Sequence, residues 1–133
     1  LARKSIILIL TDFELWQSKF ERNIQAKDSV INLCGKSNIE ELPIILNDLD
    51  LVLTNDTGTL HLSIAMGKDT VSIFGPTNPD EFGPYQDLDK HKVLRVDNSK
   101  FVKNRSKDFK SLNSIDGINV DMVYKVIEEW LEN

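Results

Sequence analysis

Short apolar runs alternate with amphipathic stretches along most of the chain. Runs rich in Ile, Leu and Val are typical of strands covered on both faces, and they occur at Ser5–Leu10, Ser29–Cys34, Leu49–Thr54, Thr70–Phe74 and Lys92–Val96. Apolar residues three or four positions apart indicate helices between and after these strands, at Phe13–Lys27, Ile39–Leu46, Gly58–Met66 and Val120–Leu131. The proline-rich segment Gly75–Asp89 is expected to form an irregular loop.

Local signals refine three of these helices. Asn38 is expected to cap the helix that follows it, with Pro43 in the second turn. Gly67 is expected to end the helix before it. The last helix should bury one apolar face, formed by Val123, Ile127, Trp130 and Leu131.

Regular alternation of strand and helix predicts an α/β fold with a parallel sheet and right-handed crossovers. The strands of such a sheet end at one edge, and ligands bind there. We call this edge the rim. Four segments are expected to meet on it, namely Thr11–Glu14, Gly35–Asn38, Asn55–His61 and Gly75–Asn78.

Composition narrows the class of protein. The 133 residues, 41% of them apolar, are enough for one domain with a core, and the net charge of −5 argues against general nucleic-acid binding. The single cysteine excludes an internal disulfide, and no signal peptide or membrane span is visible. We therefore expect a cytoplasmic location. The basic stretch Lys100–Lys110 is interpreted as a solvated loop, with an anion-binding patch as the alternative.

Several familiar sites are excluded by their motifs. The chain has no Gly-x-Gly dinucleotide fingerprint and no Gly-x-Ser-x-Gly elbow. Gly35–Ser37 resembles the end of a phosphate-binding P-loop, but Val30 stands where that motif needs glycine. The residues that could bind a metal ion occur singly and far apart in the sequence, at Cys34, His61 and His91. We therefore expect no metal site.

The segment Asn55–His61 joins a predicted strand to a predicted helix and suits phosphate oxygens. A helix start leaves backbone N–H groups unpaired and carries partial positive charge. Gly58 lets a ligand approach these groups, and the hydroxyls of Thr57 and Thr59 are further donors. His61 lies one turn beyond Thr57 on the same face, so its ring should reach the same ligand.

Asp56 does not suit a phosphate, because like charges repel, but it can accept hydrogen bonds from sugar hydroxyls. Together these residues suggest a nucleotide-sugar. The alternative is purely structural, with Asp56 capping the helix. The loop Phe74–Pro79 is stiffened by its prolines and should hold Thr77 and Asn78 near the helix start. The alternative is a turn without a ligand.

These motifs carry a resemblance to a known family. Asn55–Leu62, Ala65–Gly67 and Thr70–Pro79, in this order and spacing, closely resemble glycosyltransferase family 9, the ADP-heptose:lipopolysaccharide heptosyltransferases and their relatives. Gly35–Leu42 matches the preceding strand-to-helix turn of that family. The likeness covers Ser5 to Tyr85 well and the last helix weakly.

The resemblance implies the GT-B fold, in which two Rossmann-like domains enclose the active site. The chain would then be a single nucleotide-sugar-binding domain, most of the C-terminal half. The first strand of that domain and the N-terminal acceptor domain, with its general base, would be absent. The fragment alone is therefore expected to be inactive and to contain no catalytic residue.

The resemblance also implies the partners and the site. The expected substrates are an ADP-sugar donor, heptose by default, and a lipopolysaccharide-type acceptor at the inner face of the inner membrane, with no metal or cofactor. Lys36 and Ser37 would lie near the nucleoside and Glu14 near the ribose. Together with the residues of the two loops, the predicted donor-binding set is Glu14, Lys36, Ser37, Asp56, Thr57, Gly58, Thr59, His61, Gly75 and Thr77.

Two other interpretations stay open. A phosphoacceptor domain of the response-regulator type has similar length and alternation. It needs two acidic residues after its first strand, where only Asp12 occurs, and a lysine after the fifth, where Val96–Asn98 has none. A non-catalytic nucleotide-binding module is the other alternative.

Overall fold

The structure is a computed structural model that describes residues 6–8, 31, 33, 35–75, 77–95 and 117–133. The predicted helix Phe13–Lys27, most of the predicted strand Ser29–Cys34, the candidate Glu14 and the basic stretch Lys100–Lys110 lie outside the described residues. The fold and the site are therefore built from the remaining elements.

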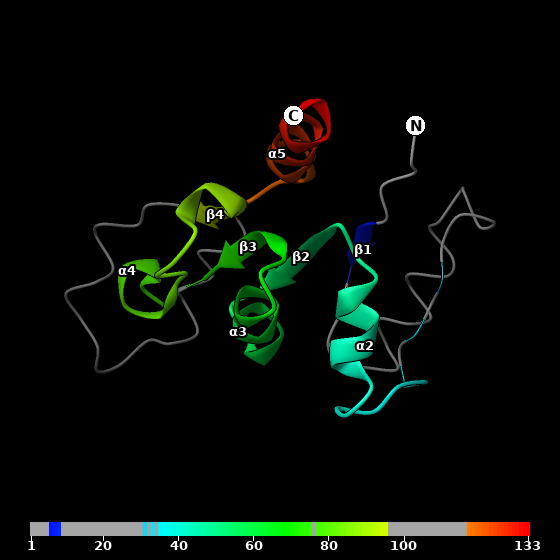
Figure 1. Ribbon diagram of the computed structural model, residues 1–133. Helices are drawn as coiled ribbons and strands as arrows, with labels where there is room; N and C mark the ends of the chain where they lie inside the picture. Colours follow the sequence, from blue (N-terminus) through cyan, green and yellow to red (C-terminus); the bar gives the residue numbers. More distant parts are fainter. Residues whose placement is uncertain (1–5, 9–30, 32, 34, 76, 96–116) are drawn as a thin grey trace.

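A parallel sheet forms the centre of the described fold (Figure 1). Its order is β1-β2-β3-β4, and each neighbouring pair is parallel. The strands are β1 (Ile6–Leu8), β2 (Leu51–Asn55), β3 (Asp69–Phe74) and β4 (His91–Arg95). The predicted α/β fold with a parallel sheet is confirmed, and the carboxyl ends of these four strands share one rim.

Helices cover both faces of the sheet (Figure 1). Helices α2 (Leu42–Asn47) and α3 (Gly58–Ala65) lie on one side and α5 (Val120–Glu132) on the other (Figure 1). Because successive side chains of a strand point to opposite faces, neighbours in β2 join different clusters. Val52 packs with Leu46 and Leu49, whereas Leu51 and Leu53 pack with residues of α5.

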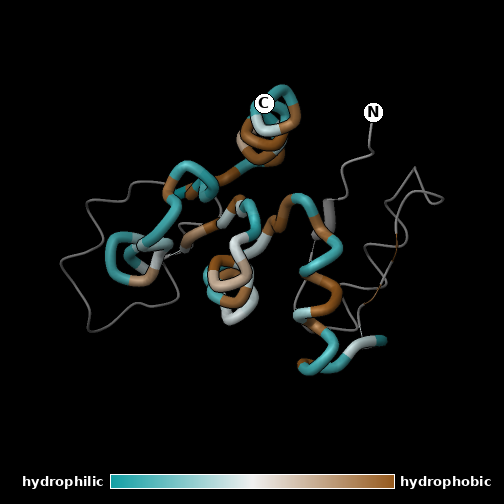
Figure 2. Tube along the Cα trace, in the orientation of Figure 1, coloured by the Kyte–Doolittle hydropathy of each residue, from teal (hydrophilic) through white to brown (hydrophobic). Residues whose placement is uncertain are grey.

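Helix α5 is amphipathic, and hydrophobic and hydrophilic residues alternate along it (Figure 2). Its packed face is formed by Val123, Val126, Ile127 and Trp130. The Trp130 Nε1–H also donates to Asp69 Oδ2 at 2.8 Å, which ties the helix to the start of β3. The prediction for Leu131 was wrong, because this side chain is 47% exposed. The i, i+3, i+4, i+7 positions that start at Val123 face the sheet instead.

The start of α2 differs from the prediction. The helix begins at Leu42, and Glu41 is its N-cap residue. Asn38 instead forms a turn ahead of the helix, in which its Oδ1 accepts from the Glu41 N–H at 2.9 Å and Glu41 Oε2 accepts from the Asn38 N–H at 3.0 Å. Pro43 lies in the first turn rather than the second, where the absence of its N–H removes no intrahelical bond.

The loop after β3 is more regular than predicted. It contains the short helix α4 (Pro79–Phe82) and the 3₁₀ turn η2 (Leu88–Lys90). Asn78 caps α4, since its Oδ1 accepts from the Asp80 N–H at 3.1 Å. An Asn cap, a proline in the first position and an acidic residue after it favour such a helix start. The predicted end of α3 is confirmed, because Gly67 has a positive φ of 70°.

His91 begins β4 at the edge of the sheet opposite the rim. Its side chain is 6% exposed, and its Nδ1 lies 2.9 Å from the hydroxyl of Thr70 on β3. Burial disfavours the charged imidazolium and lowers the pKa of His91 from its ordinary value of 6.5, although nearby acidic groups, Asp87 and Asp69 first, oppose the shift. This histidine therefore has a structural role in the neutral form.

The lowered pKa of His91 predicts a pH-dependent stability. The unfolded chain takes up a proton near pH 6.5 that the folded chain resists, so the stabilisation is present above that pH and is lost as the pH falls. The urea unfolding midpoint of the protein should drop between pH 7.5 and 6.0. In His91→Gln, which keeps a polar partner for Thr70 but does not titrate, this drop should be smaller. Equal drops in both proteins would contradict the assignment.

Candidate functional site

The rim brings together the ends of β2, β3 and β4. Asn55 is paired with Ile73, and the Asp56 N–H donates to the Ile73 carbonyl at 3.2 Å, which extends the pairing one residue past β2. Phe74 is paired with Arg95 at the end of β4. The segments that follow these strands therefore start side by side.

The start of α3 on this rim lacks a side-chain cap. Its N-cap residue is Thr57, whose backbone is extended (φ −145°, ψ 176°) and whose side chain makes no capping bond. The Thr57 carbonyl already accepts the first helical bond, from the Leu60 N–H at 3.0 Å. The structural alternative that Asp56 caps this helix is wrong. The N–H groups of Gly58 and Thr59, the first two of the helix, have no capping partner among the described residues.

Gly58 leaves this helix start open without being needed by the fold. A Cβ built on Gly58 would meet nothing within 4 Å, and its φ is not in the left-handed region. Gly83 contrasts with it, because a Cβ there would lie 2.3 Å from the Pro79 carbonyl oxygen. A steric clash with backbone therefore explains the glycine at position 83. It does not explain the glycine at position 58, which is exposed.

Asp56 is the centre of the polar contacts on the rim. The Thr77 hydroxyl donates to Asp56 Oδ2 at 2.6 Å, so the prediction that Thr77 lies near the start of α3 is confirmed. On the other side, His61 Nε2 lies 3.9 Å from Asp56 Oδ1. The Asp56 side chain is 16% exposed and that of His61 53%. Both therefore remain accessible to a ligand at the helix start.

The other predicted site residues have different surroundings. Thr59 is 6% exposed, which argues against its hydroxyl as a donor to a ligand. The Thr57 hydroxyl lies 3.5 Å from both the Thr54 hydroxyl and the Asn55 carbonyl. Gly75 is buried directly after β3.

Lys36 and Ser37 are exposed in the turn before α2. The Lys36 N–H donates to the Leu33 carbonyl at 3.0 Å. Among the contacts of the described residues, none joins this turn to Asp56 or Thr77. The structure thus brings together the candidates on β2, α3 and the loop after β3, and no described contact joins them to Lys36 or Ser37.

Arg95 is a rim residue that the sequence analysis did not single out. It is the last residue of β4 and is half-buried, and its Nη1 donates to Asn78 Oδ1 at 3.4 Å. Parallel strands end at the edge where ligands bind, so a charged residue at the end of a strand is a candidate site residue. This rule could have identified Arg95 from the sequence. Its guanidinium brings a permanent positive charge to the loop that contains Thr77.

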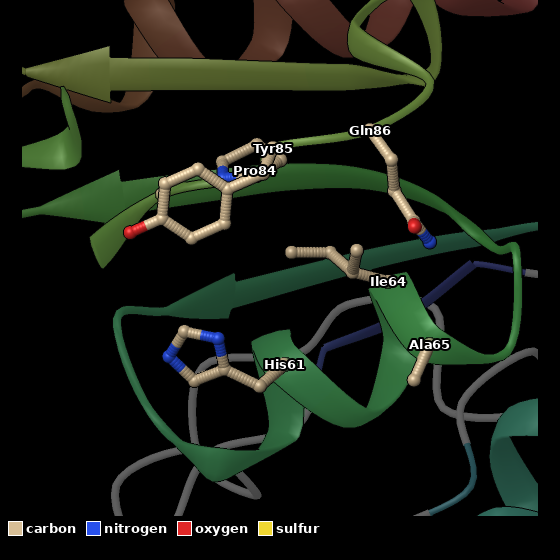
Figure 3. Close-up of a pocket in the computed structure, with 7 residues that line it drawn as sticks. His61, Ile64, Ala65, Pro84, Tyr85 and Gln86 are labelled. Atoms are coloured by element: carbon tan, nitrogen blue, oxygen red, sulfur yellow. The ribbon is translucent and has the colours of Figure 1, made fainter. Parts of the chain in front are cut away.

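A shallow cavity of about 200 Å³ opens beside His61, between α3 and the segment 83–86. Figure 3 shows the rings of His61 and Tyr85 at one end of it and Ala65 and Gln86 at the other. The Tyr85 hydroxyl donates to the Glu81 carbonyl, which attaches this segment to α4. The cavity is lined by His61, Ile64, Ala65, Gly83, Pro84, Tyr85 and Gln86.

The described residues provide neither a cluster of metal ligands nor a membrane-spanning helix. In that part of the chain, no three His, Cys, Asp or Glu side chains are grouped so that they could hold a metal ion. None of its helices has the length and the apolar character that a membrane span requires.

Comparison with known proteins identifies the family. Residues 16–111 match the model of glycosyltransferase family 9 (heptosyltransferase). The chain belongs to this family. The matched residues include the uncapped start of α3, Asp56, His61 and the Thr77 loop.

Relatives and solved structures agree with this assignment. Lipooligosaccharide heptosyltransferase 2 of Campylobacter jejuni subsp. jejuni serotype O:2 is 38% identical over 84 residues, which are 63% of this chain and 25% of that protein. A crystal structure of a family 9 glycosyl transferase from Veillonella parvula has 26% identity and a TM-score of 0.70, and the match covers 98% of this chain and 37% of that one. The chain thus spans about a quarter of the length of the curated relative.

A second solved structure bears on the fold alone. Escherichia coli ADP-heptose lps heptosyltransferase II has 20% identity and a TM-score of 0.58, with 71% of this chain and 29% of that chain covered. The TM-scores of 0.58 and 0.70 show that the chain shares the fold of the matched part of each structure. The expected Rossmann-like α/β fold of a GT-B glycosyltransferase is therefore confirmed.

Substitutions at Gly58 and Gly83 test whether the fold requires the open helix start. Gly58→Ala should leave the free energy of unfolding unchanged or raise it by up to about 1 kcal/mol, because alanine restricts the unfolded chain and has room here. Gly83→Ala should lower it by about 1–3 kcal/mol, since the added methyl clashes with backbone. Urea denaturation of both variants measures the difference. Equal losses at both positions would show that the fold itself requires Gly58.

Proposed function

We propose that this chain is the donor-binding part of a glycosyltransferase. The enzyme would move a glycosyl group, heptose by default, from a nucleotide-diphospho-sugar to a lipopolysaccharide-type saccharide acceptor. The observation that carries the proposal is the uncapped start of α3, which lies open on the rim at Gly58. Membership of a family whose matched relatives are named heptosyltransferases supports it.

The helix start supplies the diphosphate site. The free N–H groups of Gly58 and Thr59 and the helix dipole attract anionic oxygens. Gly58 has no side chain that would keep a phosphate away, and His61 lies one turn further along α3, where its exposed ring can donate to the same group. Each hydrogen bond to a charged phosphate oxygen contributes roughly 1.5–3 kcal/mol.

Asp56 supplies the sugar contact. Its carboxylate is repelled by phosphate oxygens but accepts well from hydroxyl groups. It lies directly before the helix start, with Oδ1 3.9 Å from His61 Nε2. A donor whose diphosphate lies on the N–H groups would therefore bring its sugar hydroxyls past Asp56, so that a single ligand uses both kinds of group.

The same contacts would assist the reaction. Charge develops on the diphosphate as its bond to the sugar breaks, and the N–H groups of α3 together with His61 are placed to stabilise that charge. This role needs neither a metal ion nor a cofactor. We propose that the general base, which accepts the proton of the acceptor hydroxyl, comes from the N-terminal domain of the full enzyme, at the inner face of the inner membrane.

Binding of ADP and ADP-heptose to the intact protein, measured by isothermal titration calorimetry at pH 7.5, tests the proposal. Both ligands should bind. His61→Ala should weaken both about tenfold or more, because it removes a donor to the shared diphosphate. Asp56→Ala should weaken ADP-heptose and leave ADP nearly unchanged, because only the first ligand carries the sugar hydroxyls.

His91→Gln is the matched control, since it replaces the second histidine of the chain at the opposite edge of the sheet. It should leave both affinities unchanged at pH 7.5. Failure of the folded wild-type protein to bind either ligand would overturn the proposed function. Equal losses for both ligands in Asp56→Ala would contradict the sugar contact.

A further inference from the structure

The contact between Thr77 and Asp56 links two segments that are 21 positions apart in the chain. The Thr77 hydroxyl donates to Asp56 Oδ2 at 2.6 Å, which is within the short range of hydroxyl bonds to carboxylates. Asp56 follows β2 and Thr77 follows β3, so the bond crosses between the ends of two neighbouring strands. Thr77 is thus not simply another donor on the rim, since its proton is already used by a protein group.

The loop that holds Thr77 is itself fixed by the next residue. Asn78 Oδ1 accepts from the Asp80 N–H at 3.1 Å and from Arg95 Nη1 at 3.4 Å. The Asn78 Nδ2 group donates to Glu81 Oε1 at 3.3 Å. These bonds attach the loop to α4 and to the end of β4, so little conformational freedom is left to lose when Thr77 holds its partner.

When the Asp56 side chain is held in place, its two carboxylate oxygens have different surroundings. Oδ2 is bound by Thr77, whereas Oδ1 lies 3.9 Å from His61 Nε2 on the side of α3. Without the Thr77 bond the side chain could rotate, and the positive end of α3 would attract its charge toward the N–H groups of Gly58 and Thr59. The carboxylate would then no longer present Oδ1 to a sugar hydroxyl.

We infer that Thr77 is a positioning residue for recognition of the donor sugar, acting through Asp56. Its hydroxyl holds Oδ2 so that Oδ1 stays available to a hydroxyl of the sugar. The inference rests on the proposed function and assigns to Thr77 a role other than direct contact with the donor. Thr77 therefore controls the preference for the nucleotide-sugar over the free nucleotide.

The test compares the affinities of the intact protein for ADP-heptose and ADP by calorimetry. Thr77→Val keeps the shape of the side chain but removes the donor, and it should reduce the preference for ADP-heptose about tenfold, as expected for a lost hydrogen bond to a charged group. Thr77→Ser, which keeps the hydroxyl, should restore most of the preference. Glu81→Ala removes only the acceptor of the Asn78 Nδ2 group and keeps the Thr77 hydroxyl, so it should reduce the preference less than Thr77→Val does.

A double-mutant cycle separates positioning from direct contact. In an Asp56→Ala background, Thr77→Val should have no further effect on the preference. An additional loss there, an equal loss for both ligands, or an unchanged preference in Thr77→Val alone would overturn the inference and leave the proposed function standing. Absence of binding by the folded wild-type protein would overturn both, so the two failures are distinguishable.

Discussion

Parallel pairing of β2 with β3 is the constraint on which the site depends. Their register places Asn55 opposite Ile73, and the Asp56 N–H continues the ladder by one bond to the Ile73 carbonyl. The two chains therefore leave the sheet together, and the residues that follow are within contact distance. The bond between Asp56 and Thr77 is a direct consequence, since a strand ending elsewhere would separate them.

Two opposite charges lie within a few residues of each other on the rim. The start of α3 attracts anions, and Asp56, one residue before the N-cap, is itself an anion. These two charges do not pair with each other in the structure. Thr77 holds one oxygen of the Asp56 carboxylate, and the N–H groups at the start of α3 stay uncapped. Under the proposed function, a ligand with a diphosphate and a hydroxyl-rich group would satisfy both groups, whereas free phosphate or a free sugar would satisfy one. This arrangement gives the family assignment a physical basis in this chain.

Most of the described fold could be predicted because its signals are local. The buried strand β2 lies in a run rich in Leu and Val, and Gly67 ends a helix through its own backbone freedom. The errors occurred where two local signals competed. Asn38 is a good cap, but Pro43 fits the first turn of a helix, and so α2 begins at Leu42. Leu131 is apolar and within α5, yet rotation of 100° per residue carries it away from the face that meets the sheet.

The sequence by itself determined the alternation of elements, the rim segments Asn55–His61 and Gly75–Asn78, and the family, because each of these depends on residues close together in the chain. Only the tertiary structure decided which polar groups meet. It shows that Asp56 accepts from Thr77 instead of capping α3, and that Arg95 reaches Asn78. Such contacts depend on the register between strands, which is set by the packing of both sheet faces and by no single segment.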